Sequence, residues 1–499
     1  MARSYADYMN AISPDELFEG LLGYGLFSDK LPNCLTSEIF YNYYVKNKPA
    51  FPNNTWHQYA IYLANKNDGN CRLLGIPTPM SYCNLCKVLS ANWPRLQSYF
   101  ANATSGQQHE VSRIHIRKIK HKKSLFEMNY PLWTHGDSPE DSLTVGANFK
   151  VHVDISQCFS SIYTHTIPWA LVGKDESRSS RRKWFNKIDS RASVMKDGQT
   201  HGILIGPHAS NVLSEIVLCS IDAKMIPKWN YVRHIDDYTC YAKSYADAQF
   251  FIRDLEKYLR EYGLYLNTKK TSITNLPQPS NEEWVRELNM AFSVLNSLTM
   301  NYKTMESFWS KVIELYYQSD KNASVFAYAI KMLSKVRMSH NALSYYKKAV
   351  FTVALLLPYL VPFLGEFFLK CFKFTKVELI DFINLLYDKG LETDDYELLA
   401  FAVYYALLCN VGINNLRTES AINSNDCLFL LMSYLYCEKC HDKTGLLTLY
   451  NFAKGLPAGK SSEFDKLWLF AYEILDEADL AHEWKDMKKA GVTFVNRQW

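Results

Sequence analysis

An adjacent pair of aspartates, Asp236 and Asp237, lies within a run of β-branched and aromatic residues over positions 231–241. Such a run predicts two strands joined by a tight turn at the aspartates, which is a β-hairpin. Asp is common in exposed turns, so the alternative to a functional site is a solvated turn with no chemical role. The choice depends on what the rest of the chain brings to this turn.

A second predicted strand, at positions 150–155, favours the functional interpretation. Val151 and Val153 share one face of this strand, while His152 and Asp154 share the other. If the strand joins the sheet of the hairpin, a third carboxylate comes up beside the first two. Three close carboxylates repel unless divalent cations neutralise them, and oxygen ligands of this kind suit Mg²⁺, which also binds substrate phosphates. Such a site can stabilise both the attacking and the leaving oxygen of a phosphoryl transfer.

The composition indicates an ordinary globular protein with no membrane anchor. The 499 residues are enough for two or more domains, and the net charge of +4 is too small to steer nucleic acid by itself. No apolar leader precedes the 12 scattered cysteines, so we expect reduced thiols in a cytoplasmic protein. The apolar run 349–365 is shorter than a membrane span, and Pro358 and Pro362 predict two buried helices that meet at a corner.

Two Cys-x-x-Cys pairs, Cys83/Cys86 and Cys437/Cys440, lie in helix-like sequence. A structural zinc site needs four ligands, which here would have to come from both pairs together. We therefore interpret them as core or surface thiols rather than as zinc ligands.

A basic segment at positions 113–123 precedes the Asp154 strand. Arg113 and Arg117 alternate with isoleucines there, and Lys118 follows, which predicts a strand pair or hairpin. Two interpretations are open. The basic face is either simply solvated or grips phosphates of a triphosphate or a nucleic-acid backbone.

Three segments between and after the predicted strands have simple local patterns. Positions 158–163 predict a helix that ends before Pro168. Gly206 and Pro207 open a long predicted helix, and glycine at this entry lets the backbone approach a ligand closely. Positions 263–271 predict a turn and strand that carry two lysines.

The pattern changes after a predicted linker at 275–282. From 283 to 499 the chain carries successive helical patterns of about 9 to 16 residues, an ordinary length for globular helices. They cover positions 306–317, 324–336, 342–357, 377–387, 398–408, 427–436 and 467–475. We expect an all-α region, and paired helices stacked into a solenoid would explain it, although the repeat period is irregular.

The order of these segments resembles that of the reverse-transcriptase superfamily. The Asp154 strand and the Gly206 helix entry resemble its palm motifs A and B, and the aspartate hairpin and positions 263–271 resemble motifs C and D. Together these motifs cover residues 110–275. Each motif alone is weak, but the four in this order are specific.

Positions 162–169 and 200–203 further resemble the abortive-infection polymerases of the AbiK type. The resemblance implies an α+β fold, with reverse-transcriptase-like fingers and palm followed by an all-α, HEAT-like domain. We expect the fingers and N-terminal part at 1–145, the palm at 146–280 and the helical domain at 281–499.

The resemblance also implies roles for individual residues. Asp154, Asp236 and Asp237 would hold two Mg²⁺ ions, for which Mn²⁺ could substitute, and dNTPs would be the substrates. Phe159 matches a bulky family residue against the sugar 2′ position, which favours deoxynucleotides. Lys269 or its neighbour Lys270 would assist the leaving pyrophosphate. The residues implied in substrate binding are Arg113, Arg117, Lys118, Phe159, Ile205, Gly206 and Lys269.

Two positions depart from the family pattern. His234 stands where a tyrosine usually precedes the aspartates, and Ile205 stands where a glutamine usually precedes the motif B glycine. That glutamine helps to position a templated nucleotide pair, and isoleucine has no side-chain hydrogen-bonding group. AbiK-like enzymes synthesise DNA without a template, prime it on a tyrosine hydroxyl and form homo-oligomers during phage defence.

We therefore expect a Mg²⁺-dependent, untemplated DNA polymerase of the bacterial cytoplasm, whose single-stranded product stays covalently attached to a homo-oligomeric protein. Candidates for the priming tyrosine are Tyr8, Tyr41, Tyr43 and Tyr44, in the polar N-terminal region. Two alternatives remain. One is an RNA-templated reverse transcriptase of retron or intron type, and the other is a non-catalytic palm-like relic whose helical part binds a partner.

Overall fold

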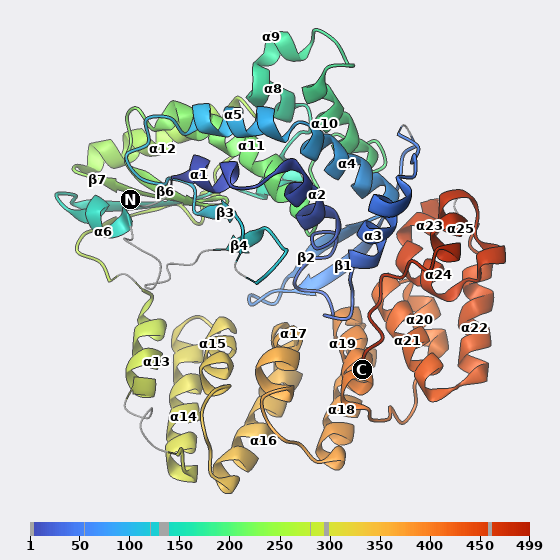
Figure 1. The fold of residues 1–499 in the computed structure, drawn as a ribbon. Helices are drawn as coiled ribbons and strands as arrows, with labels where there is room; N and C mark the ends of the chain where they lie inside the picture. Colours follow the sequence, from blue (N-terminus) through green and yellow to red (C-terminus); the bar gives the residue numbers. More distant parts are fainter. Residues whose placement is uncertain are drawn as a thin grey trace.

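A mixed α/β region is followed by a region built of helices (Figure 1). The computed structural model describes residues 4–53, 55–119, 121–128, 139–279, 281–293, 299–457 and 462–499. The elements of the mixed region are α1 (Tyr5–Asn10), α2 (Pro14–Leu22), α3 (Glu38–Asn47), β1 (Tyr59–Asn65), β2 (Cys71–Pro77), α4 (Pro79–Ala91), α5 (Trp93–Ala103), β3 (Ile114–Ile116), β4 (Phe126–Met128), α6 (Pro139–Thr144), β5 (Phe149–Asp154), α7 (Cys158–Ser161), α8 (Thr166–Val172), α9 (Lys174–Ser177), α10 (Trp184–Val194), α11 (His208–Met225), β6 (Tyr231–His234), β7 (Asp237–Ala242), α12 (Tyr245–Arg260) and β8 (Ser272–Asn275).

The elements that the structure describes beyond β8 are all helical. They are α13 (Glu283–Ser293), α14 (Tyr302–Gln318), α15 (Ser324–Leu333), α16 (His340–Leu356), η1 (Pro358–Leu360), α17 (Val361–Leu364), η2 (Gly365–Leu369), α18 (Lys376–Thr393), α19 (Tyr396–Cys409), α20 (Thr418–Ser424), α21 (Cys427–Cys440), α22 (Lys443–Lys454), α23 (Ser462–Lys466), α24 (Trp468–Ile474), η3 (Glu477–Asp479) and α25 (His482–Lys489).

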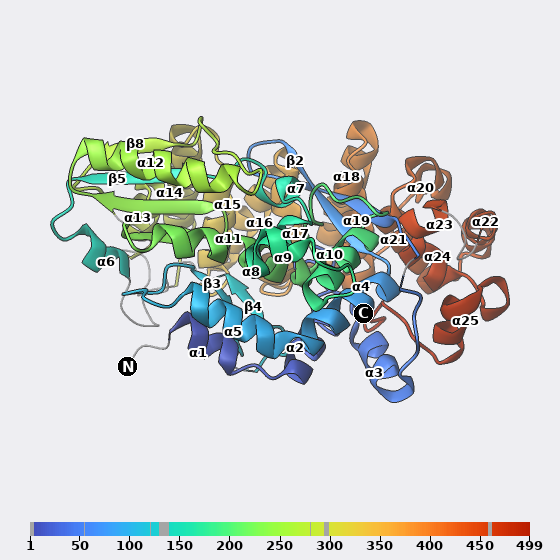
Figure 2. The ribbon, with the colours of Figure 1, turned by 90° about the horizontal axis from the view of Figure 1, so that it is seen from above.

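The central sheet is antiparallel, with strand order β6-β7-β5-β8. Alternation along its strands buries one face, which includes Val151, Val153, Tyr238 and Cys240. Helix α12 packs across β5 and β7, and α11 packs beside α12 (Figure 2). The strand and the hairpin that alternation predicts around the aspartates are therefore confirmed.

The segment after β5 differs from its prediction. In place of one helix that ends before Pro168, the structure has the short helix α7 and then α8, which contains Pro168 within its first turn. Proline is tolerated there because the first N–H groups of a helix have no intrahelical acceptor. The proline thus lies near the start of a helix and does not end one.

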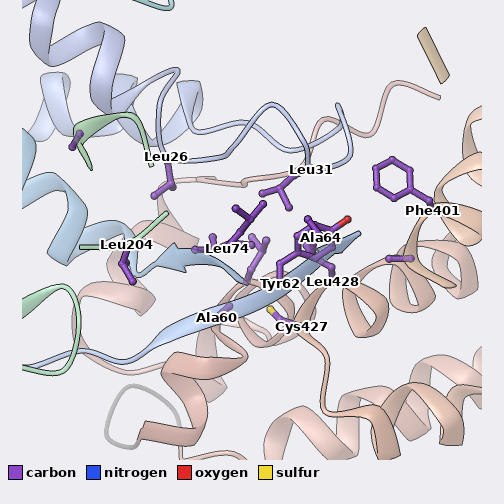
Figure 3. Close-up of a cluster of buried hydrophobic side chains, with 14 of the residues drawn as sticks. Leu26, Leu31, Ala60, Tyr62, Ala64, Leu74, Leu204, Phe401, Cys427 and Leu428 are labelled. Atoms are coloured by element: carbon purple, nitrogen blue, oxygen red, sulfur yellow. The ribbon is translucent and has the colours of Figure 1, made fainter. Parts of the chain in front are cut away.

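A second hairpin, β1–β2, joins the mixed and helical regions. Its strands pair from Tyr59 with Pro77 to Asn65 with Cys71. One face, which includes Ala60, Tyr62, Ala64 and Leu74, is buried, and it lies beside Phe401, Cys427 and Leu428 of the helical region (Figure 3). The Trp468 indole N–H also donates to the Ile76 carbonyl at 3.1 Å. The helical region therefore shares a core with the N-terminal hairpin.

The helices of the C-terminal region begin at strong local signals. Helices α14, α16, α18, α19, α21 and α22 each start with a side chain that accepts a backbone N–H, from Asn301, Ser339, Thr375, Asp395, Asp426 and Asp442 respectively. Figure 1 shows α13 to α19 side by side along the mixed region, with α20 to α25 gathered beyond the α19 end of that row. All seven predicted helices are present, with ends shifted by a few residues.

The apolar run around Pro358 and Pro362 folds as two helical segments that meet at a corner. Helix α16 and the segment Pro358–Leu369 are bent by 120° relative to each other. Over the described residues, no single helix is long and apolar enough to cross a membrane; this bent pair meets the criterion only when its two halves are taken together.

Candidate active site

The three aspartates come together at one end of the central sheet. Asp154 ends β5, Asp237 begins β7 directly opposite it, and Asp236 lies in the two-residue turn between β6 and β7. One carboxylate oxygen from each lies within 4.8 Å of the other two. Asp154 is buried, whereas Asp236 and Asp237 are partly exposed. The sheet thus produces the convergence on which the metal-site hypothesis depends.

Few positive groups compensate these carboxylates. Lys270 Nζ lies 3.2 Å from Asp154 Oδ1, and its side chain is 62% exposed. Asn267 donates to Asp154 twice, from its side-chain amide at 3.0 Å and from its backbone N–H to the carbonyl at 2.7 Å. His152 Nε2 is 3.7 Å from Asp237 Oδ1. An exposed lysine screens weakly, so the cluster retains excess negative charge.

The electrostatics of the cluster favour binding of a cation. Burial raises the pKa of Asp236. Burial, together with the charges of Asp236 and Asp154, raises the pKa of Asp237 to about 7. A divalent cation would take the place of this proton and relieve the repulsion. Because the donors are all carboxylate oxygens, the set fits Mg²⁺ or Mn²⁺.

A glycine-bounded loop before α11 lies against the hairpin β1–β2. The φ angle of Gly206 is +126°, and a Cβ there would approach the Gly75 carbonyl oxygen to 3.2 Å. The Gly75 N–H donates to the Ile205 carbonyl at 2.8 Å. Glycine is needed at position 206 because two backbones meet there.

The same loop holds Phe159 beside the end of β5. The Ile203 N–H donates to the Phe159 carbonyl at 2.8 Å. Phe159 and Ile205 are both partly buried and pack against the core. The structure therefore groups Phe159, Ile205 and Gly206 around one loop.

The basic residues predicted to grip phosphate have partners within the protein, two of them on the N-terminal helices α1 and α2. Lys118 Nζ pairs with Glu16 at 2.6 Å, and Arg113 Nη1 lies 3.5 Å from Glu110. The Arg117 guanidinium lies 5.9 Å from the centre of the Tyr8 ring. The ion pairs of Arg113 and Lys118 reduce the charge that they could offer to a triphosphate.

Nothing in the sequence predicted a role for Arg72. Arg72 and Lys270 are the two cations whose charges partly offset the rise in the pKa of Asp236. Arg72 lies on β2, opposite Ala64 of β1. The two apolar runs at 59–64 and 73–76, on either side of the turn residues Asp68 and Gly69, were the signal that could have identified this hairpin. How close Arg72 lies to the carboxylates depends on how this hairpin packs.

Of the two lysines after Gly263, only Lys270 pairs with an aspartate of the cluster among the described contacts.

The candidate priming tyrosines lie on two helices. Tyr8 is on α1. Tyr41, Tyr43 and Tyr44 are on α3, where all three are partly buried, and Tyr41 and Tyr44 pack on Phe18. In both views α3 lies apart from the central sheet (Figures 1 and 2).

The cysteine pairs form no candidate metal centre among the described residues. Cys83 and Cys86 are buried in α4, and Cys437 is buried while Cys440 is exposed at the end of α21. In the part of the chain that the structure describes, the one group of three or more metal-binding side chains is the aspartate cluster.

One family of known proteins is similar to the part of the chain that contains the site. No curated protein matches the chain. A solved structure of apo telomerase from Candida Tropicalis is similar over 78% of this chain and 69% of that chain, at 12% sequence identity and a TM-score of 0.32. A family model described as "Reverse transcriptase (RNA-dependent DNA polymerase)" matches residues 65–302, which include all three aspartates. Over these residues, which are just under half of the chain, the protein is therefore similar to reverse transcriptases.

Proposed function

We propose that this protein is a divalent-metal-dependent DNA polymerase that builds DNA on one of its own tyrosines without a template, in abortive-infection defence against phage. The observation that carries the metal-dependent part is the cluster of Asp154, Asp236 and Asp237, in which Asp154 pairs with the exposed Lys270 and the pKa of Asp237 is still raised to about 7. These aspartates would hold two Mg²⁺ ions. When bound, the ions supply charge neutralisation at the attacking and leaving oxygens of nucleotidyl transfer.

The surrounding residues have distinct tasks in this proposal. Lys270 gives up its contact with Asp154 when the carboxylate binds a cation, and its exposed ammonium then stabilises the leaving pyrophosphate. Arg72 offers a second positive group for the phosphates. Phe159 excludes a ribose 2′-hydroxyl, and Gly206 lets backbone approach the nucleotide. Arg113, Arg117, Lys118 and Lys269 are secondary candidates.

Ile205 supports synthesis without a template. It lies between β2 and α11, held through its carbonyl by Gly75, and its side chain cannot hydrogen-bond a templated nucleotide pair. Priming on Tyr8, Tyr41, Tyr43 or Tyr44, a covalently attached product and a homo-oligomer in the bacterial cytoplasm rest on the AbiK-like segments. So does the division into fingers at 1–145, palm at 146–280 and a HEAT-like domain at 281–499.

Intact mass spectrometry tests the proposal most directly. The purified protein is incubated with dNTPs and Mg²⁺ in the absence of nucleic acid, and its mass is measured before and after nuclease treatment. We expect a Mg²⁺-dependent mass gain that nuclease removes in part, because a tyrosine-linked nucleotide remains. Asp236→Asn should abolish the gain, whereas Asp381→Asn, at an exposed site on α18, should not. An unchanged mass would contradict the proposal.

A second candidate is an RNA-templated reverse transcriptase, which the description of the matching family favours. Addition of a defined RNA distinguishes the two, since a templated enzyme yields a product complementary to that RNA. The third candidate, a non-catalytic partner-binding protein, predicts that replacing Asp236 and Asp237 by alanine leaves the antiphage effect intact.

A further inference from the structure

A completely buried arginine lies directly behind the aspartate turn. Arg233 on β6 is 0% exposed, and its guanidinium spans Glu215 at 2.8 Å and Asp222 at 2.7 Å, both on α11. Both carboxylates are also buried. A buried ion cluster of this kind is costly to form, and replacing it with apolar residues often leaves stability unchanged or improves it. Stability alone therefore does not explain why this ion cluster lies so close to the candidate active site.

Hydroxyl groups complete the cluster from other elements. Tyr231 donates to Asp222 at 2.7 Å, while Tyr5 of α1 and Ser112 donate to Glu215 at 2.6 Å and 3.0 Å. The cluster therefore joins the N-terminal helix, α11 and the central sheet. Its charges are paired and hydrogen-bonded, which makes it a rigid support.

The cluster reaches the turn through one hydrogen bond. Arg233 Nη1 donates to the Ile235 carbonyl at 3.0 Å, and the Ile155 N–H donates to the Asp236 carbonyl at 3.1 Å. The backbone of the turn is thus held from the side of the cluster and from the side of β5. These two contacts act on the peptides that carry the aspartates.

Ile235 shows why the turn needs this support. Its φ angle is +57°, a conformation that β-branched residues rarely adopt, and Asp236 has no positive φ. A two-residue hairpin turn with positive φ at its first position follows the type II′ pattern, which normally has glycine there. The turn is therefore in a conformation that its own sequence disfavours.

We propose that Arg233 is a positioning residue that holds the Ile235–Asp236 turn in this conformation, so that Asp236 and Asp237 meet Asp154 at metal-binding distance. The support extends through Glu215 to Tyr5, so that α1 contributes to the geometry of the active site. The inference rests on the proposed function for its catalytic meaning. Its geometric part, the shape of the carboxylate cluster, can be measured by metal binding alone.

Mn²⁺ affinity, measured by electron paramagnetic resonance, tests the positioning role independently of DNA synthesis. Arg233→Lys keeps one charge but cannot span two carboxylates and the Ile235 carbonyl. We expect its Mn²⁺ affinity and its rate of nucleotide addition to fall by roughly 10-fold or more, as for other groups that orient metal ligands. Arg253→Lys, at an exposed site on α12, is the matched control and should behave as the wild type.

A rescue variant separates positioning from general loosening of the fold. In the Arg233→Lys background, Ile235→Gly should recover part of the lost Mn²⁺ affinity, because glycine adopts positive φ without strain. A folded Arg233→Lys protein with wild-type affinity would overturn the proposal. So would a weakened affinity that Ile235→Gly leaves unchanged.

Tyr5→Phe decides the question if Arg233→Lys does not fold. It removes one donor to Glu215 and should weaken Mn²⁺ binding by roughly threefold, because Arg233 still pairs both carboxylates. Tyr99→Phe is its control, since it loses an equally short bond to the same helix, to the Ile216 carbonyl outside the cluster. Equal Mn²⁺ affinities in the two variants would overturn the proposal.

The same measurements distinguish the positioning role of Arg233 from the proposed function. Mn²⁺ binding that Asp236→Asn abolishes, without any nucleotide addition, would overturn the proposed function and leave the positioning role to be judged by the variants. Absence of Mn²⁺ binding in the wild-type protein would overturn both.

Discussion

Two acidic clusters lie close together in this protein and are built in opposite ways. Asp154, Asp236 and Asp237 face one another with one exposed lysine beside them. Glu215 and Asp222, which reach the aspartate turn through Arg233, enclose its guanidinium and accept hydroxyl donors. The charges of the second cluster are paired with one another inside the protein, whereas the first has too little positive charge beside it to offset the repulsion between its carboxylates. The difference shows that the compensation of buried acids, rather than their number, distinguishes a support from a binding site.

A third buried acid is intermediate between the two. Glu397 on α19 is 3% exposed and accepts from the Tyr62 hydroxyl and the Asn65 N–H, each at 2.6 Å. No lysine or arginine forms an ion pair with it among the described contacts. Burial raises its pKa to about 7. It joins the hairpin β1–β2 to the helical region by hydrogen bonds alone.

The largest effect should come from the uncompensated cluster and should fall on activity. We expect Asp237→Asn to lower nucleotide addition on the order of 10³-fold, because a ligand of the reacting centre is lost. Its free energy of unfolding in EDTA should be unchanged or higher, since one of three repelling charges is gone. Incorporation rates and urea unfolding measure the two quantities. Lower stability together with full activity would contradict the assignment.

In the compensated cluster, removal of a partner should also lower stability. We expect Glu215→Ala to lower the free energy of unfolding by about 3 to 5 kcal/mol, because Arg233 loses a partner while it stays buried. Urea unfolding in EDTA measures this, with Glu261→Ala, half of a surface pair with Lys224, as the control that should cost less than about 1 kcal/mol. Equal losses of unfolding free energy in the two variants would contradict the expected difference between the buried cluster and a surface ion pair.

Glu397 should make stability depend on pH. Its native pKa of about 7 exceeds the unfolded value of 4.5, so the native state holds the proton more tightly. The resulting contribution, about 3 kcal/mol, is fully present below pH 4.5 and is lost as the pH rises through about 7. Unfolding free energies measured across this range should decline less steeply in Glu397→Gln than in the wild type. Parallel curves for the two proteins would contradict the expectation.

The smallest effect concerns the lysine beside the uncompensated cluster. We expect Lys270→Gln to slow nucleotide addition by roughly 10-fold or more, because the cation near the leaving group is lost. Mn²⁺ affinity should not decrease, since the lysine competes with the metal for Asp154. Lys269→Gln, which removes the neighbouring lysine, is the matched control. Equal rates in the two variants would exclude a special role for Lys270.

Local patterns predicted much of the fold and the centre of the candidate site. Alternation identified β5 and the hairpin β6–β7, and helical spacing located α14, α16 and α19 to within a few residues. These features depend on neighbours in sequence, such as the Ser339 cap of α16. The convergence of the aspartates followed as soon as the strands were assumed to share a sheet.

Other parts could not be read from the sequence. The hairpin β1–β2 lies against helices more than 300 positions later in the chain, and its packing decides how close Arg72 lies to the aspartates. The ion-pair partners of the basic residues could not be predicted either, because Lys118 pairs with Glu16, which lies far away in the sequence on α2. Side-chain partners far apart in sequence leave no periodic signal.

The sequence by itself determined that three acidic residues would end or join strands, because strand alternation and turn chemistry are local properties. Only the structure shows that these strands share one sheet. Only the tertiary structure decided which acids remain uncompensated. Arg233, Glu215 and Tyr5 meet because α1, α11 and β6 pack together, and that packing places paired buried charges behind the turn and three mutually repelling carboxylates at its tip. Burial and charge compensation are properties of the folded core, and no short stretch of sequence contains them.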